Sequence, residues 1–302
     1  MSIPSMSSDE LHTIMREFDQ AVYHHDRWAE RLVGTLICRG AAEPVDLAPE
    51  AHRHCSFGQW YYGGGAMALA DHPAFAEIDA QHALLHQIAA RLLEVTAAGG
   101  APAAEDYERF RRALKQFRLE IATLHRDLED ALANLDPLTG APNRVAMLAR
   151  LREQHQAIKH GARPATVALV NLDHFQAVND THGVPAGDKV LTAFAQHILA
   201  HLRSYDHVFR HGGAEFLILI RDADMETAAG VLERLRAALG AINHRGKHGA
   251  FNVTVSLGAA PLDPEVPVEM SIERAGEALA KAKAGGRNRL DLWKAEGAAR
   301  AA

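Results

Sequence analysis

The chain has only two cysteines among its 302 residues, too few for a scaffold held together by disulfides. It also has no basic excess: 32 lysines and arginines against 38 aspartates and glutamates give a formal charge of −6 with histidine neutral. We therefore expect no nucleic-acid partner, because phosphate backbones are bound mainly by positive charge. No run approaches the roughly 20 apolar residues that cross a bilayer, and the N-terminus MSIPSMSSDE lacks the features of a signal peptide. We expect a cytoplasmic protein with no membrane partner.

The length predicts two domains, at roughly 100–200 residues per domain. Hydrophobic residues make up 48% of the chain and charged residues 23%, an ordinary globular composition with enough apolar material for two cores. Histidine is unusually common, with 19 copies. A single histidine therefore carries little information, and only a spaced set of them is a signal.

The first part of the chain has the periodicity of helices. Apolar residues recur at spacings of three and four along Leu11–Val33. After a loop rich in glycine and proline, a second long helix is expected at about Asp71–Thr96 and a third at about Glu105–Asn134. We predict an antiparallel helical bundle over residues 1–133. Its charged last helix would serve as a stiff connector to the second domain.

The second part alternates strands and helices. Strands are expected at about 165–173 and 251–260, with a hairpin around a Gly-Gly turn at 207–220. Helices are expected at about 174–182, 187–202, 225–239 and 268–284. We predict an α/β domain with a mixed sheet over residues 134–293, and a disordered tail at 294–302.

Four residues of the bundle have the spacing of metal ligands. His82 and His86 are four apart on a predicted helix, so both imidazoles lie on one face of it. His25 lies in the first helix and Cys55 in the following loop. Three imidazoles and one thiolate complete a tetrahedral zinc site and leave no position for a catalytic water. The alternative is a histidine-rich bundle with surface histidines and one buried cysteine.

The pattern around these four residues resembles the chemoreceptor zinc-binding (CZB) domain over about residues 8–133. The matching residues are, in chain order, His25, Trp28, Cys55, Gly58, Trp60, His82 and His86. The resemblance implies a sensor domain that binds zinc tightly and forms a homodimer. We expect the two tryptophans to belong to the bundle core instead of the metal site.

Four motifs of the second part resemble the GGDEF domain of diguanylate cyclases, in the order that the family has them. They are DPLTGAPNR (136–144), NLDHFQAVNDTHGVPAGD (171–188), RHGGAEF (210–216) and KAKAGGRN (281–288). The resemblance implies a nucleotidyl-cyclase-like fold. In that family two facing domains of a dimer join two GTP molecules into cyclic di-GMP with the help of divalent cations. A zinc-binding domain followed by a GGDEF domain resembles the zinc-inhibited diguanylate cyclases.

Six residues match family positions that contact the nucleotide. They are Asn179 and Asp188 for guanine, Gly212 and Gly213 for close approach to the phosphates, and Lys283 and Arg287 for the terminal phosphates. An amide and a carboxylate satisfy the guanine edge, and cationic side chains suit phosphate. The resemblance therefore implies GTP as a candidate partner. Each residue taken alone is also compatible with an ordinary polar surface position.

Two departures from the family pattern fall on the catalytic metal site. Asn171 and Ala214 stand where the family has metal-binding carboxylates, the second of which is also catalytic. Magnesium needs charged oxygen ligands, so we expect magnesium binding in this domain to be impaired. Glu215 keeps its catalytic family position, but it should point to the opposite strand face from Ala214. Asp173 matches a different family position, and the sequence leaves open whether Ala214 is natural or engineered.

One further motif is intact. In RSYD (203–206), five residues separate Asp206 from Gly212, the offset of the family's RxxD inhibitory site. Arg203 offers a planar fork to phosphate or guanine, and Asp206 can accept from guanine nitrogens. Arg234 would make a secondary contact. The alternative is an ordinary loop tetrapeptide, but the fixed offset favours a cyclic di-GMP site.

Three functions compete. The first is a zinc-responsive cyclic di-GMP receptor with a degenerate cyclase site that signals through an unidentified protein partner. The second is an active diguanylate cyclase inhibited by zinc, and the third is a non-enzymatic modulator that forms heterodimers with another cyclase. The missing carboxylates disfavour the second, and the intact RSYD disfavours the third.

Overall fold

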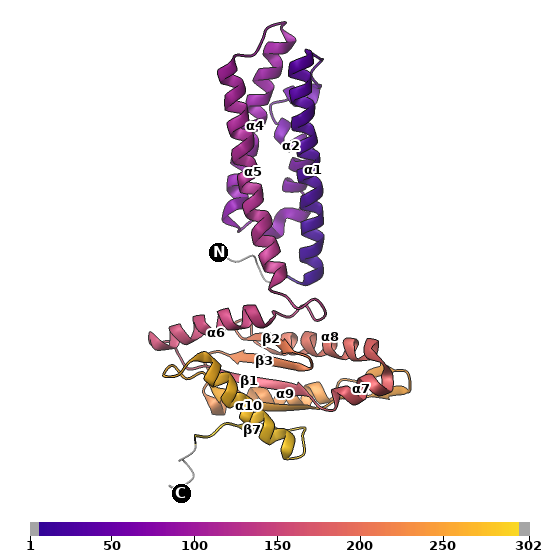
Figure 1. Ribbon diagram of the computed structural model, residues 1–302, viewed down its shortest axis with the longest axis vertical. Coiled ribbons are helices and arrows are strands. Elements are labelled where there is room, and N and C mark those ends of the chain that lie inside the picture. The colour runs from indigo at the N-terminus through magenta and orange to yellow at the C-terminus, as the bar shows by residue number, and fades with distance from the viewer. Residues whose placement is uncertain (1–5, 296–302) are drawn as a thin grey trace. The chain divides into compact units, whose positions relative to one another are not determined.

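The computed structural model describes residues 6–295 (Figure 1), and the chain divides into two compact units between Ala133 and Asn134. The division falls where the hydrophobic pattern changes from continuous helix to alternating strands and helices. Of the predicted tail at 294–302, residues 296–302 lie outside the described residues. None of the helices within 6–295 has both the length and the hydropathy that a membrane span requires.

Three long helices dominate the first unit: α1 (Ser8–Cys38), α4 (Pro73–Ala97) and α5 (Ala104–Ala133). A capping box starts α1, because Ser7 and Glu10 each accept a hydrogen bond from the other's backbone N–H. A short turn joins α4 to α5, which pack as antiparallel neighbours (Figure 1). The expected loop after α1 contains short helical segments, namely η1 (Pro44–Leu47), α2 (Ala51–His54), α3 (Ser56–Tyr62) and η2 (Gly64–Leu69).

The second unit is built on a five-stranded sheet of order β2-β3-β1-β6-β7. Its strands are β1 (Thr166–Leu172), β2 (His207–Gly212), β3 (Glu215–Ile220), β6 (Val255–Pro261) and β7 (Leu290–Leu292). The last pair is parallel and the others are antiparallel, so the predicted mixed sheet is confirmed. A separate small hairpin, β4 (His244–Gly246) with β5 (Gly249–Phe251), was not expected from the sequence.

Helices cover both faces of this sheet. The helices α8 (Val184–His201) and α9 (Met225–Gly240) pack on one face, whereas α6 (Arg144–Lys159) and α10 (Val268–Ala284) pack on the other. The short helix α7 (Phe175–His182) lies between β1 and α8 in the chain. Side chains of β1 alternate: Val170 faces α8 and α9, and Leu169 faces α6 and α10. The alternation places Asn171 on the α6 and α10 side.

Candidate functional site

The four predicted metal ligands converge in the core of the first unit. His25 lies on α1, Cys55 immediately precedes α3, and His82 and His86 lie one turn apart on α4. One ligand atom of each lies within 4.8 Å of the others, and Sγ of Cys55 is 3.3 Å from Nε2 of His82. Ligand atoms around tetrahedral zinc are about 3.3–3.6 Å apart, given bonds of about 2.0–2.3 Å. Small side-chain rotations would therefore bring all four onto one ion.

Several nitrogens of this cluster lack a hydrogen-bond partner. Within the described residues, Nε2 of His25, Nδ1 of His82 and both ring nitrogens of His86 are buried and unpaired. A buried polar atom without a partner costs free energy. A metal ion would give His25 and His86 the partner that the protein itself does not supply. The donor set therefore fits zinc.

Burial also sets the protonation of the cluster. It lowers the pKa of His25 and His82 far below the usual value, and nearby histidines add to the effect. Burial, with a smaller contribution from His52, lowers the pKa of His86 to about 3, and burial raises the pKa of the Cys55 thiol to about 11. The imidazoles are thus held neutral, which is the form that binds metal, whereas the thiol would lose its proton to the ion.

Local backbone geometry explains the Cys-x-x-Gly spacing. Cys55 is the N-cap of α3, and its Sγ accepts a hydrogen bond from the backbone N–H of Gly58 at 3.2 Å. A Cβ at position 58 would lie 1.9 Å from the carbonyl oxygen of His52. Only glycine fits where the chain passes this close to itself, so Gly58 allows the turn that presents the thiol.

Trp28 lies in the bundle core, as expected, but it also contacts the metal-ligand cluster. Its indole stacks on the imidazole of His86, with ring centroids 4.0 Å apart and planes inclined by 22°. Its Nε1 donates a 2.9 Å hydrogen bond to Oδ1 of the buried Asp46 on η1. The sequence does not single out Asp46, because an acidic residue in a loop carries no distinguishing signal. Trp60 instead packs on Phe18.

In the second unit, the altered cyclase positions lie where β1 and β3 meet. Asn171 pairs with Glu215 across the two strands, so both side chains share the face covered by α6 and α10. Ala214 packs against the core on the opposite face. Nδ1 of His211 lies 2.8 Å from Oε1 of Glu215 and engages that carboxylate. The end of β1 and the start of β3 therefore present one carboxylate and an amide, with the imidazole of His211 beside them, and Ala214 adds no ligand.

Asp173 does not replace the missing carboxylates. It is buried, and its oxygens accept hydrogen bonds from the hydroxyls of Thr254 and Ser256 and from the backbone N–H of Asn288. Through these contacts Asp173 links the start of β6 to the turn that follows α10.

The two basic residues predicted to bind phosphate lie at the C-terminal end of α10 and in the turn that follows it. Lys283 lies in the last turn of α10, and Arg287 is exposed just beyond it. Arg287 and Asn288 have φ angles of 63° and 46°, a left-handed conformation that costs a non-glycine residue of order 1 kcal/mol. Nη1 of Arg236 donates to both oxygens of Asn288 and, together with Asp173, holds the turn.

Gly212 ends β2 and Gly213 follows it, and both glycines are exposed. Nη2 of Arg210 donates to the carbonyl of Gly213 at 3.0 Å, and its Nη1 pairs with Asp136 at 2.7 Å. Within residues 6–295, no heavy atom beyond the adjacent residues lies within 4 Å of where a Cβ of Gly212 or Gly213 would stand. The turn can therefore be approached closely by a ligand.

The two predicted guanine contacts lie on α7 and α8. Oδ1 of Asn179 is buried without a hydrogen-bond partner in the described part of the chain, and a Cβ on Gly187 would lie 1.9 Å from it. Asp188 lines a hollow of about 430 Å³ together with Leu138 and Thr192. An unpaired amide oxygen and a carboxylate can satisfy the donors of a guanine edge.

Comparison with known families accounts for both units. The model of the diguanylate cyclase GGDEF domain matches residues 133–289, more than half of the chain. The chain belongs to the GGDEF family. The model of the chemoreceptor zinc-binding domain matches residues 25–93, so the GGDEF domain follows a CZB domain, and the resemblance read from the motifs is confirmed.

Several members of the GGDEF family are similar to this chain. Diguanylate cyclase DgcZ of Escherichia coli K12 is 29% identical over 284 residues, which cover 93% of this chain and 94% of that protein. Diguanylate cyclase DgcP of Pseudomonas aeruginosa is 40% identical over 171 residues, which cover 56% of this chain but only 25% of DgcP.

Solved structures of GGDEF proteins show the same fold. The coiled coil and GGDEF domain of DgcB from Caulobacter crescentus, in complex with cyclic di-GMP, align with a TM-score of 0.57 and 28% identity over 60% of this chain and 97% of that one. Diguanylate cyclase SiaD from Pseudomonas aeruginosa, in complex with its activator SiaC, aligns with a TM-score of 0.52 and 32% identity over 74% of this chain and 92% of that one.

The RSYD segment of the GGDEF domain forms the turn before β2. Arg203 is exposed, and its Nη1 donates to the hydroxyl of Tyr205 at 2.8 Å. Asp206 is buried, and its carboxylate accepts hydrogen bonds from the backbone N–H groups of Arg203 and Arg221. Asp206 therefore closes this turn, and a ligand would use its remaining lone pairs. Arg203 is the exposed member of the predicted pair.

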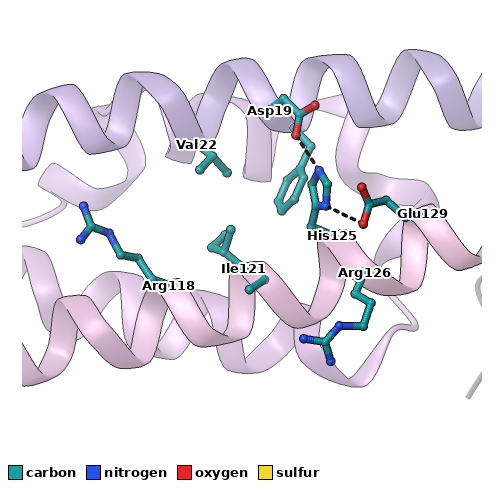
Figure 2. A pocket seen from close by; sticks show the side chains of 9 residues that line it. Asp19, Val22, Arg118, Ile121, His125, Arg126 and Glu129 are labelled. Carbon is teal, nitrogen blue, oxygen red and sulfur yellow. Dashed lines mark ion pairs between the residues drawn. The ribbon is translucent and has the colours of Figure 1, made fainter.

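A hollow of about 490 Å³ lies between α1 and α5 of the CZB domain (Figure 2). Val22 and Ile121 contribute apolar surface to it. At one end His125 lies between Asp19 and Glu129, with nitrogen–oxygen distances of 3.1 and 3.4 Å. These three side chains contact one another, and we assign no ligand to the hollow.

Proposed function

We propose that this protein is a zinc-responsive cyclic di-GMP signalling protein whose GGDEF domain binds cyclic di-GMP at Arg203 and Asp206 but produces little of it. The observation that carries this proposal is the absence of both expected metal carboxylates, at Asn171 and Ala214. The remaining carboxylate at the strand end, Glu215, contacts His211. Magnesium prefers several charged oxygen ligands in octahedral geometry, and the ends of β1 and β3 offer too few.

The sensory input in this proposal is zinc bound by His25, Cys55, His82 and His86. Zinc would join α1, α4 and the start of α3 at one point, which is a structural and not a catalytic use of the metal. The burial and unpaired nitrogens of these residues support the assignment. A homodimer is part of the proposal, because the resemblance to the CZB family implies a domain that dimerises.

A second candidate is an active, zinc-inhibited diguanylate cyclase. It is favoured by the similarity to DgcZ along nearly the whole chain. It is also favoured by the position of Glu215, whose side chain lies on the same sheet face as that of Asn171. In this case Glu215, the Asn171 amide and backbone carbonyls would have to hold the cation.

Replacing Arg203 by alanine is expected to weaken cyclic di-GMP binding roughly 10- to 100-fold, the effect of losing charge-assisted hydrogen bonds worth about 1.5–3 kcal/mol. Isothermal titration calorimetry of the full chain would measure it. Arg152→Ala is the matched control, because Arg152 is an exposed arginine of the same domain that pairs only with Glu269 among the contacts found for it. Equal affinities of the parent and Arg203→Ala would contradict the proposed site. No binding by the parent would favour the heterodimerising modulator.

A further inference from the structure

We propose that Asp46 is a positioning residue for zinc, which holds the ligand His86 in place through the indole of Trp28. The inference rests on the proposed zinc site and adds two residues outside the ligand set. Its starting point is an unbroken chain of contacts from η1 to α1 to α4. Oδ1 of Asp46 accepts from Nε1 of Trp28 at 2.9 Å, and the indole stacks on the imidazole 4.0 Å away.

Of the three imidazoles, His86 most needs such support. Both of its ring nitrogens are buried without a hydrogen bond in the described residues, so no hydrogen bond fixes the rotation of the ring. His82 differs, because its Nε2 contacts Sγ of Cys55. The ring contacts of His86 are the near-parallel stack on Trp28 at 4.0 Å and edge-on contacts with His82 at 4.8 Å and His25 at 5.6 Å. The stack on Trp28 is the closest of the three and therefore does most to select the orientation of the His86 ring.

Trp28 is in turn fixed by a carboxylate that is costly to bury. Asp46 is only 9% exposed, and a buried carboxylate is tolerated when it is hydrogen-bonded. The indole N–H is a single donor, and a charged acceptor makes the stronger hydrogen bond to it. The pair thus fixes the tilt of the indole, and the indole fixes the ring that would bind the ion. Contacts that orient metal ligands typically change affinity by about 10- to 100-fold when removed.

Zinc affinity of the full chain, measured by competition with a chromophoric chelator, tests the inference. Asp46→Leu is expected to raise the zinc dissociation constant roughly 10- to 100-fold while one ion still binds. Asp46→Asn keeps an oxygen that accepts from Trp28 and is expected to bind zinc nearly as the parent does. Trp28→Phe keeps a ring but cannot donate to Asp46, so it is expected to weaken binding in the same range as Asp46→Leu. If Asp46→Leu does not fold, the zinc affinity of Trp28→Phe still tests the inference.

Absorption of the cobalt-substituted protein separates positioning from general stability. The visible bands report ligand geometry, so they are expected to shift in Asp46→Leu and to match the parent in Asp46→Asn. Asp127→Leu is the control, since it breaks the 3.1 Å contact with His72 elsewhere in the bundle and should leave the cobalt bands and the zinc affinity unchanged. Parent-like affinity and bands in Asp46→Leu and Trp28→Phe, or an Asp46→Asn variant as weak as Asp46→Leu, would overturn the inference. A parent chain that binds no zinc would overturn the proposed metal site as well.

Discussion

Removing zinc from the purified protein is expected to destabilise the CZB domain severely. Structural zinc contributes on the order of 10 kcal/mol or more, which rivals the 5–15 kcal/mol typical of a whole domain. The metal-free protein would also keep the buried, unpaired nitrogens of His25 and His86. Circular dichroism melts before and after chelation, with metal analysis of each sample, would show the loss of helical stability and one zinc per chain in the untreated protein.

The double variant Cys55→Ala with His82→Ala should behave like the chelated protein and bind no zinc. Its matched control is Cys38→Ala with His12→Ala, which removes the same residue types from exposed positions on α1. The control should melt like the parent. Protein purified without a chelator that contains no zinc, or unchanged zinc content in the double variant, would refute the ligand assignment.

Acidification should lower the remaining stability of the metal-free CZB domain further, which denaturant titrations at several pH values would measure. Burial lowers the folded-state pKa of His86 to about 3 from its usual 6.5, so between these values the unfolded chain binds a proton that the folded chain does not. The contribution of this histidine to stability is then fully present above about pH 6.5 and is lost as the pH drops toward 3, by about 1.4 kcal/mol per pH unit. His82 and His25 shift in the same direction and steepen the loss.

Restoring the two carboxylates is expected to create or greatly raise cyclase activity. With GTP and magnesium, the parent should release at most a trace of cyclic di-GMP. Asn171→Asp with Ala214→Glu should raise the rate by roughly 100-fold or more, the typical effect of one preorganised charge-stabilising group. The residues that match the family's guanine and phosphate positions keep the expected types, so the double variant changes only the two positions that the family fills with metal-binding carboxylates. Chromatographic detection of the product measures the effect.

The control for this experiment is Gln156→Glu with Ala162→Glu. It adds the same two charges at exposed positions of the GGDEF domain, near the end of α6, and should remain inactive. Robust product from the parent would refute the degenerate-site account and support the zinc-inhibited cyclase. An inactive but folded double variant would show that the missing carboxylates are not what limits the reaction.

The sequence predicted those features that depend on local periodicity. The long helices follow from apolar spacing, and His82 and His86 share a face because they are four residues apart. Strand alternation also placed Ala214 and Glu215 on opposite faces. These features can be predicted without knowing what packs against each segment.

Features that depend on tertiary contacts were not predicted. The four-residue segments η1 and α2 are too short for a helical periodicity to be seen. Asp46 acquires its role from Trp28, which is 18 residues away in the chain, and no local pattern links the two. The pairing of Glu215 with Asn171 depends on the register of β1 against β3, which the separate motifs do not specify.

The most direct test of the central claim is calorimetric titration of the full chain with cyclic di-GMP in its zinc-loaded and zinc-stripped forms. Between these forms a roughly 5- to 150-fold change in affinity is expected, the range of typical couplings of about 1–3 kcal/mol. Because coupling of binding is reciprocal, cyclic di-GMP must change zinc affinity by the same factor. Identical cyclic di-GMP affinities in the two forms would contradict the account and leave two independent modules on one chain.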